Sequence, residues 1–141
     1  MGRLVVERLL DRAPAAKVVT VVREPERVEE LARLGIGVRR GHYDEPESLA
    51  PAFAGAGRLV LISSPELAAD RRIGHHRAAI DAAARAGVGA IAYTSFLGAD
   101  AEATGVTEAH HATEAAIPAA AQPCCRPCPR GARPDRTWPP S

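Results

Sequence analysis

The order of elements at the start of the chain is the feature that most constrains its fold. Residues 4–10 carry apolar side chains at the spacing of an amphipathic helix, and residues 18–23 (VVTVVR) form an apolar strand pattern that ends in arginine. A helix followed by such a strand is the second half of a β-α-β unit. The strand and glycine-rich turn that open a unit of this kind are not in the sequence, so we expect its first half to be missing.

Helix and strand patterns continue to alternate along the chain. The periodicity predicts strands at 36–40, 58–62 and 89–93. It predicts helices at 24–34, 46–53 and 106–117, and a long helix that begins at 65 or 68 and ends at 86. Near-continuous apolar strands separated by helices are typical of a parallel sheet covered on both faces. The predicted fold class is therefore α/β, a Rossmann-like doubly wound parallel sheet that is incomplete because the first strand and glycine-rich loop are missing.

Local signals mark the ends of these helices. Gly35 occupies the position at which a left-handed residue ends a helix, and Gly87 closes the long helix. Asp44 is placed to cap the helix that carries Leu49 and Phe53. In the helix at 24–34, we expect an apolar stripe facing the core, together with an ion pair one turn apart. The stripe consists of Val28, Leu31 and Leu34, and the pair of Glu29 and Arg33.

Composition excludes several classes of function. The formal net charge is +1, and no run of basic residues alternates with aromatic ones, so the sequence does not predict nucleic-acid binding. The longest apolar run, residues 59–62, is far too short to cross a membrane. No basic segment followed by an apolar run marks a signal peptide. We therefore expect a soluble cytoplasmic protein with no membrane partner.

The sequence changes in character at Pro118. The segment 118–141 holds seven of the 12 prolines and all three cysteines, and it has neither helical nor strand periodicity. We therefore divide the chain into a partial nucleotide-binding domain, 1–117, and an irregular tail, 118–141. A shift of reading frame and a natural proline-rich extension are the two hypotheses for this tail. Its Cys-Cys-x-x-Cys run lacks a fourth ligand, so we predict no metal site.

Polar side chains follow the predicted strands at their carboxyl ends, where parallel α/β sheets bind ligands. Arg23 stands where such sheets meet the adenosine ribose, and an arginine there accommodates the 2′-phosphate of NADP. A solvated loop arginine is the alternative. Ser63, Ser64, Thr94 and Ser95 place hydroxyls at the same edge. Thr94 and Ser95 are candidates for contacts in the cleft, and caps of the following helices are the alternative for all of these hydroxyls.

Tyrosine and histidine are the remaining candidates for chemistry. A catalytic tyrosine of the dehydrogenase type needs a lysine four residues later, and Leu97 stands four residues after Tyr93, so we expect Tyr93 to be a packed strand residue and assign no catalytic residue. The adjacent pairs 75–76 and 110–111 cannot place two ligands on one helix face, and we expect solvated histidines. His110 is the exception, because its helix is expected to cross the mouth of the cleft.

Several segments taken in order carry a resemblance to a known family. They are residues 2–7 (GRLVVE), 21–25 (VVREP), 41–44 (GHYD), 61–66 (LISSPE), 92–95 (AYTS) and 110–114 (HHATE). This series, within residues 2 to 117, resembles the NmrA-like branch of the atypical short-chain dehydrogenase/reductases, and within it the NAD(P)H:quinone oxidoreductases.

The resemblance implies NADPH as cofactor and assigns roles to matching residues. Arg23 matches the contact to the 2′-phosphate, and Gly2 matches the end of the glycine-rich loop. Ser64, Pro65 and Glu66 match the loop that lies against the cofactor. Three departures stand out: His42 replaces an acidic residue at the adenine side, most of the glycine-rich loop is missing, and the region beyond the sixth helix is missing.

Three functional hypotheses follow from the resemblance. The first is an oxidoreductase that transfers hydride from NADPH to a quinone-like small molecule, with weak or no activity in this shortened chain. The second is a redox sensor of the NmrA type that binds NAD(P) without turnover, and the third is an inactive gene fragment. Without the central first strand, the strands at 18–22 and 58–62 have unpaired inner edges, so we expect self-association.

Overall fold

The computed structural model describes residues 2–96 and 106–120, and helices and strands alternate along this part of the chain. The elements are, in order, α1 (Gly2–Leu10), the 3-10 helix η1 (Ala15–Lys17), β1 (Val19–Val22), the 3-10 helix η2 (Pro25–Val28), α2 (Glu29–Arg33), β2 (Gly37–Arg40), the 3-10 helix η3 (Pro46–Ser48), α3 (Leu49–Phe53), β3 (Arg58–Leu61), α4 (Ala69–Arg85), β4 (Ala90–Tyr93) and α5 (Val106–Ala120).

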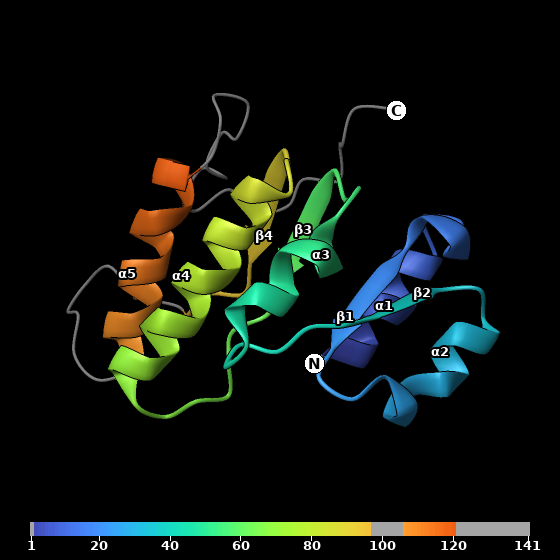
Figure 1. The fold of residues 1–141 in the computed structure, drawn as a ribbon, viewed down its shortest axis with the longest axis horizontal. Helices are drawn as coiled ribbons and strands as arrows, with labels where there is room; N and C mark the ends of the chain where they lie inside the picture. Colours follow the sequence, from blue (N-terminus) through green and yellow to red (C-terminus); the bar gives the residue numbers. More distant parts are fainter. Residues whose placement is uncertain (1, 97–105, 121–141) are drawn as a thin grey trace.

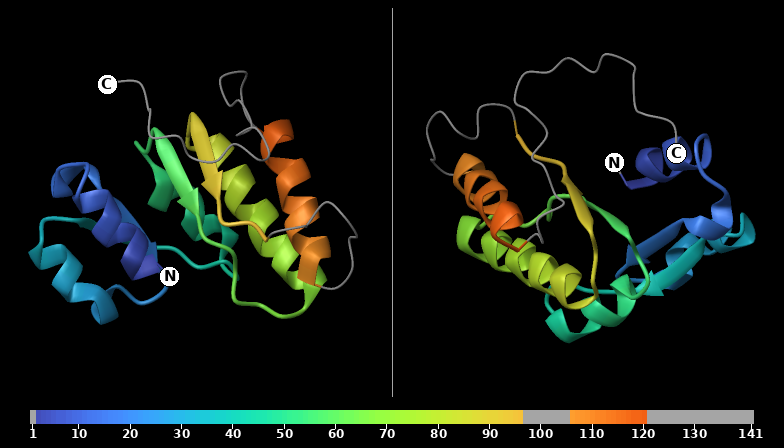
Figure 2. Two further views of the ribbon diagram at one scale, coloured as in Figure 1. Left: turned by 180° about the vertical axis from the view of Figure 1, so that it is seen from behind. Right: turned by 90° about the horizontal axis from the view of Figure 1, so that it is seen from above.

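The strands form two parallel pairs. β1 pairs with β2 in a register that places Val19 opposite Gly37, and β3 pairs with β4, with Arg58 opposite Ala90. Within the described residues β1 and β3 are not hydrogen-bonded to each other, so the molecule has two two-stranded sheets. Helices α4 and α5 lie side by side over the β3–β4 pair, whereas α1 and α2 lie with the β1–β2 pair (Figures 1 and 2). The predicted α/β class with parallel strands is confirmed.

Most predicted elements form close to their expected bounds, and several details differ. The first part of the helix expected at 46–53 is the 3-10 helix η3. The first half of the helix expected at 24–34 is the 3-10 helix η2, and Leu34 is 57% exposed rather than part of a buried stripe. Helix α5 continues to Ala120, three residues beyond the expected end. Gly35 has a φ of 82°, the left-handed conformation that was predicted, and Gly87, where the long helix was expected to end, has a φ of 75°.

The larger core lies between α4 and the strands it covers. Leu49 and Phe53 project from α3 into this core, as their spacing predicts, and Ile80 at the centre of α4 is 1% exposed. Alanines of α4 (Ala79, Ala82 and Ala83) let the helix approach the sheet closely. A second, smaller core of Val6, Val18 and Ile36 joins α1 to the β1–β2 pair. Each sheet therefore has its own core.

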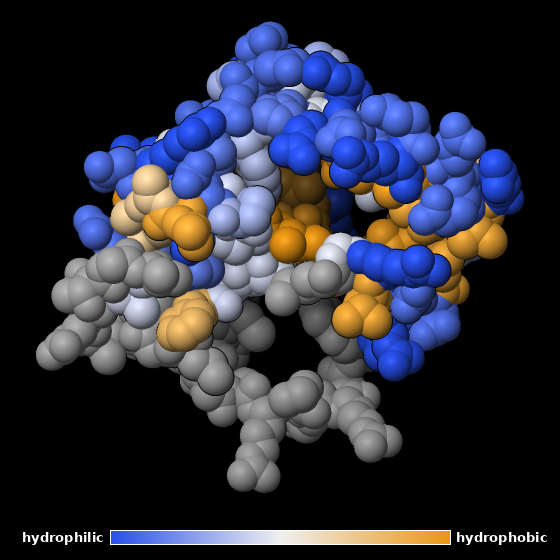
Figure 3. Space-filling view, turned by 90° about the horizontal axis from the view of Figure 1, so that it is seen from below, coloured by the Kyte–Doolittle hydropathy of each residue, from blue (hydrophilic) through white to orange (hydrophobic). Residues whose placement is uncertain are grey.

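Several helices begin at the edge where the strands end. The first residues of α1, α4 and α5 lie at the lower end in Figure 1, which is also the end at which β1, β3 and β4 finish. Figure 3 views the molecule from that side and shows a hollow with hydrophobic residues on its floor, between the part that contains α4 and the part that contains α1. Polar residues border much of the hollow.

Candidate functional site

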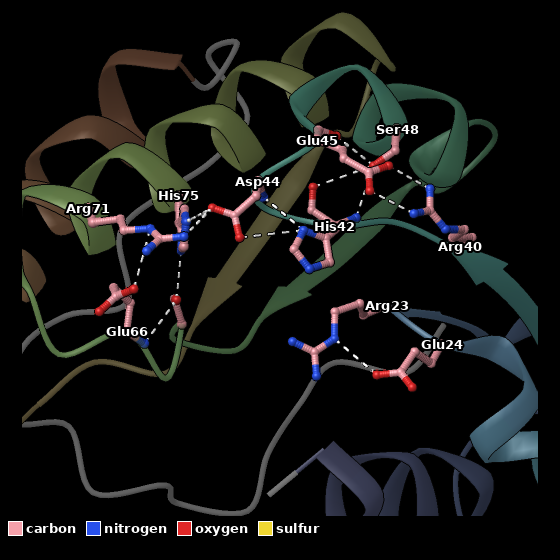
Figure 4. A network of polar contacts seen from close by, with 11 residues as sticks. Arg23, Glu24, Arg40, His42, Asp44, Glu45, Ser48, Glu66, Arg71 and His75 are labelled. Carbon is pink, nitrogen blue, oxygen red and sulfur yellow. Dashed lines mark hydrogen bonds and ion pairs between the residues drawn. The ribbon is translucent and has the colours of Figure 1, made fainter.

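Arg23 is the first residue after β1, at the carboxyl edge of the sheet. Its side chain is 66% exposed, and its Nε donates a hydrogen bond of 3.2 Å to Glu24 (Figure 4). An exposed ion pair of this kind contributes little to stability. The exposed guanidinium can therefore donate hydrogen bonds to a ligand. Gly2 begins α1 near the same edge, and a Cβ added there would lie 3.7 Å from the Ile62 side chain, an ordinary contact.

The loop after β2 folds around Ser48 and Arg40. The Ser48 hydroxyl accepts a hydrogen bond of 2.9 Å from the backbone N–H of His42, and the guanidinium of Arg40 binds both carboxylate oxygens of Glu45, at 2.6 and 2.7 Å (Figure 4). The prediction that Asp44 caps the following helix is wrong: η3 begins at Pro46 after Glu45, with no side-chain cap. The Asp44 carboxylate is instead engaged by α4.

Asp44 connects the loop after β2 with α4. Its Oδ1 accepts hydrogen bonds from Arg71 at 2.9 Å and from His75 at 3.1 Å (Figure 4). These two hydrogen bonds, first that of Arg71, lower the pKa of the Asp44 carboxyl. Because Asp44 follows β2 whereas α4 packs on β3 and β4, this contact joins the two sheets at their carboxyl edge.

The loop after β3 is tied to the same helix. The Ser64 hydroxyl, which is buried, bonds Nδ1 of His75 at 2.9 Å, and the Glu66 carboxylate accepts hydrogen bonds from the backbone N–H groups of Leu67 and Ala68. These backbone bonds are the main cause of the lowered pKa of Glu66. Helix α4 begins at Ala69 without a side-chain cap, so the alternative that Ser63 or Ser64 caps this helix is wrong.

His76 lies at the centre of a buried chain of hydrogen bonds. Its Nε2 accepts the backbone N–H of Ser64 at 2.9 Å, so the ring proton is on Nδ1, which donates to Thr113 at 2.8 Å. The Thr113 hydroxyl in turn donates to the carbonyl of Ala109 at 2.6 Å. Burial is the largest cause that lowers the pKa of His76, to about 4, so its ring is neutral at pH 7.

Tyr93 and His110 extend this chain towards the end of β4. The Tyr93 hydroxyl lies 2.8 Å from Nδ1 of His110 and 3.4 Å from Nδ1 of His76. Burial raises the pKa of Tyr93 and lowers that of His110, so both groups are neutral at pH 7. Tyr93 is a half-buried strand residue, as expected, but its hydroxyl also connects two histidines.

The two cleft candidates after β4 bind groups within the protein. Thr94 Oγ1 accepts the backbone N–H of Ser63 at 2.9 Å, and the Ser95 hydroxyl donates to Glu114 of α5. These bonds fasten the end of β4 to the neighbouring strand and helix. Whether Thr94 or Ser95 also contacts a substrate stays a prediction.

The prediction of solvated histidines is wrong for His76, which is fully buried, and for His75, whose side chain is 12% exposed and bonded to Ser64 and Asp44. It is right for His111, which is exposed. His110, the predicted exception, is 6% exposed. Sequence reasoning treated each histidine pair by itself and overlooked a stripe along α4. Positions 72, 76, 79, 80 and 83 share one helical face, and all five side chains are buried. This spacing was the signal that His76 faces the core.

Residues 2–96 and 106–120 contain neither a candidate metal site nor a candidate membrane span. No three metal-ligating side chains gather there, and the tail cysteines lie outside the described residues. No helix in this part of the chain has both the length and the apolar character needed to span a membrane.

Comparison with known proteins identifies the family. The sequence profile of the NAD(P)H-binding family matches residues 1–122, most of the chain. This chain belongs to the NAD(P)H-binding family. It is 41% identical over 114 residues to quinone oxidoreductase 2 of Escherichia coli, a match that covers 81% of this chain and 39% of that protein. The resemblance to quinone oxidoreductases is thereby confirmed.

Solved structures agree with this assignment. The chain is 39% identical to the triphenylmethane reductase of Citrobacter sp. complexed with NADP(H), with a TM-score of 0.81 over 84% of this chain and 42% of that one. It is also 39% identical to an NADPH-dependent quinone oxidoreductase of Escherichia coli complexed with NADPH, with a TM-score of 0.78 over 84% of this chain and 41% of that one. The chain thus spans about two fifths of these relatives.

Proposed function

We propose that the chain binds NADPH along the carboxyl edge of its strands and serves a reductase that transfers hydride to a quinone-like small molecule. The observation that carries this proposal is the likeness to two reductases solved with NADP(H) or NADPH, at TM-scores of 0.81 and 0.78. Their shared cofactor suits an arginine at the end of β1. The quinone oxidoreductase of 41% identity favours a quinone as acceptor.

The residues present fit the cofactor on its ribose side. The exposed Arg23 guanidinium can pair with a 2′-phosphate, which an acidic residue there would repel. Gly2 and the start of α1 are suited to the pyrophosphate, because a helix N-terminus favours anions. In the loop after β3, Pro65 is exposed and can contact the cofactor directly, whereas the Ser64 hydroxyl is buried and bonded to His75. The Glu66 carboxylate already binds its own loop and Arg71, so we assign Glu66 a role in shaping the loop.

The role we propose for the residues of this chain is to position the cofactor and the acceptor, rather than to act as a general acid. The cofactor supplies the hydride when bound. No lysine accompanies Tyr93 at the spacing of a tyrosine-based dehydrogenase, and the Tyr93 hydroxyl is engaged with His110. Burial, by raising the pKa of Tyr93, further disfavours a tyrosinate. The residues at the carboxyl edge would hold donor and acceptor at the right distance.

Nucleotide titration of the full chain tests the cofactor assignment. We expect Arg23→Ala to weaken NADPH binding by about 10- to 100-fold, as loss of a charge-assisted phosphate contact does, and to change NADH binding little. Arg33→Ala is the matched control, because Arg33 is an exposed arginine on α2 that pairs with Glu29 at 3.3 Å. Equal losses for NADPH and NADH would contradict the assignment of Arg23 to the 2′-phosphate.

Reduction of 1,4-naphthoquinone, followed by loss of NADPH absorbance, tests the reaction. Saturable NADPH binding with turnover supports the oxidoreductase. Saturable binding without turnover contradicts it and favours the sensor hypothesis. Absence of any nucleotide binding contradicts both and favours the inactive fragment.

A further inference from the structure

Arg72 is a buried cation that the proposed cofactor site does not use. It lies in the first turn of α4 and is 6% exposed, and its Nε has no hydrogen-bond partner within the described residues. No acidic side chain in this part of the chain forms an ion pair with it. A guanidinium remains charged in proteins, and a buried charge without a partner is costly. Such a group indicates a partner that binds from outside.

The groups around Arg72 include one tyrosine and two histidines, which are neutral at pH 7, and the carboxylate of Glu114. The charge of Arg72 acts on His76, Tyr93 and His110, and in both histidines it adds to burial in lowering the pKa. Glu114 is the acidic group that acts on Tyr93 and His110, and its carboxylate already accepts a hydrogen bond from Ser95. Within the described residues, Arg72 forms no direct ion pair with Glu114 or with any other carboxylate, although the charge of Glu114 acts on the same tyrosine and histidine.

An exposed aromatic ring lies beside His110. Phe96, just after β4, is 55% exposed, and its ring centroid is 6.0 Å from that of His110, at an interplanar angle of 33°. A large exposed ring next to buried polar groups suits a flat aromatic ligand, which can cover the ring while its polar edge reaches inward. The planar fork of an arginine binds delocalised oxyanions through two parallel hydrogen bonds.

We propose that Arg72, His110 and Phe96 form a subsite for a planar aromatic oxyanion, the ionised form of a quinone-type ligand. Arg72 supplies the positive charge, Phe96 supplies the stacking surface, and His110 connects the subsite to the buried chain through Tyr93. The quinone character of the ligand rests on the proposed function. The preference for an anion rests on Arg72 alone.

Two probes of the same ring system test the charge preference. At pH 7.5, 2-hydroxy-1,4-naphthoquinone carries an ionised oxygen, whereas 1,4-naphthoquinone is neutral. We expect the full chain, without NADPH, to bind the ionised quinone at least about 10-fold more tightly in a calorimetric titration. Equal affinities for the two quinones would overturn the proposal.

Two variants test whether Arg72 causes the preference for the ionised quinone. We expect Arg72→Met to remove it and Arg77→Met, an exposed arginine on the same helix, to keep it. If Arg72→Met does not fold, the histidine resonances of the unaltered chain decide the question. The ionised quinone is expected to raise the pKa of His110, because a negative charge then lies beside the ring, and the neutral quinone is not. Binding that leaves His110 unchanged would overturn the proposal.

These results are separable from those for the proposed function. Binding of the ionised quinone without NADPH-dependent reduction would leave the Arg72 subsite standing and contradict the reductase. Reduction of quinones with no preference for the ionised probe would support the reductase and contradict the Arg72 subsite.

Discussion

At the scale of single residues, His76 couples folding to pH. The folded protein holds its pKa at about 4, against 6.5 for an ordinary histidine, because the ring is buried. As pH falls below about 6.5, the unfolded chain takes up a proton that the folded protein does not. The free energy of unfolding therefore decreases between about pH 6.5 and 4, by up to ~3 kcal/mol from this group. Urea unfolding at pH 7.5, 6.5, 5.5 and 5.0 measures the slope.

The variant His76→Gln isolates this residue, because its amide oxygen can replace Nε2 as acceptor but does not titrate. We expect a smaller decrease in stability above pH 5 in this variant, where the carboxyls with lowered pKa, Asp44, Glu45 and Glu66, remain ionised. His110, whose pKa is also lowered, retains the rest of the slope. His111→Gln, at an exposed position, is the control. An identical slope in His76→Gln and the unaltered chain would contradict the prediction.

Residue types at strand ends could be predicted, but their partners could not. Arg23 and Ser64 stand where the order of strands puts them, because that position depends on the local sequence. The bonds of Asp44 to Arg71 and His75 depend on two segments that meet only in the folded protein. Tertiary contact therefore overrode the local preference of Asp44 for a helix cap.

At the scale of elements, Gly41, the residue that follows β2, allows the chain to pack closely against Val21 of β1. A Cβ at this position would lie 2.5 Å from Cγ1 of Val21, well inside contact distance. Valine is stiff about χ1 and cannot easily move aside. We expect Gly41→Ala to reduce the free energy of unfolding by about 1–3 kcal/mol, the usual cost of overpacking, as measured by urea unfolding.

A second substitution tests the cause. Val21→Ala removes the clashing methyl groups, so Gly41→Ala is expected to cost less in a Val21→Ala background than alone. Gly74 is the matched control, because it lies within α4 and its added Cβ meets nothing within 4 Å. Gly74→Ala is expected to stabilise the protein by roughly 0.5–1 kcal/mol. An equal cost of Gly41→Ala in both backgrounds would exclude the contact with Val21 as its cause.

The bounds of most elements follow from local signals. Gly35 and Gly87 end their helices as their sequence positions predict, because only a left-handed residue is needed and glycine adopts it freely. Leu34 is exposed at the C-terminal cap of α2, after its last helical residue Arg33, whereas Leu31 inside the helix packs against the smaller core. The exact bounds of short helices without side-chain caps depend on tertiary packing, which the local sequence does not reveal.

At the scale of the whole molecule, the α/β class was predictable because apolar strands and helices alternate. From the sequence we predicted unpaired inner edges on the strands at 18–22 and 58–62, but not two separate sheets. The contacts that join the two sheets were not predicted either. Asp44 crosses between the loop after β2 and α4, and the Tyr43 hydroxyl donates to the carbonyl of Ile62, at 3.0 Å. Such links depend on the folded arrangement, and neither residue has a local pattern that predicts its partner.

The free strand edges predict self-association. In a parallel pair, alternate residues direct both backbone groups to the same neighbour. Val22 and Leu61 direct their carbonyls to the partner strands, so Val21 and Val60 present theirs to the opposite edge. Within the described residues neither edge is paired, and an open edge is a template for another chain. We expect the apparent mass of the 141-residue chain to rise with concentration in size-exclusion chromatography with light scattering.

Charged substitutions on the edge strands test this mechanism. Val19 and Val60 are each 40% exposed on β1 and β3, so a lysine at either position can reach solvent and place its charge beside the open edge. We expect Val19→Lys with Val60→Lys to lower the apparent mass at every concentration. Leu67→Lys is the control, because Leu67 is 83% exposed in a loop and its replacement also removes apolar surface. If Leu67→Lys lowers association as much as the edge variants do, general hydrophobic contact rather than strand pairing drives it.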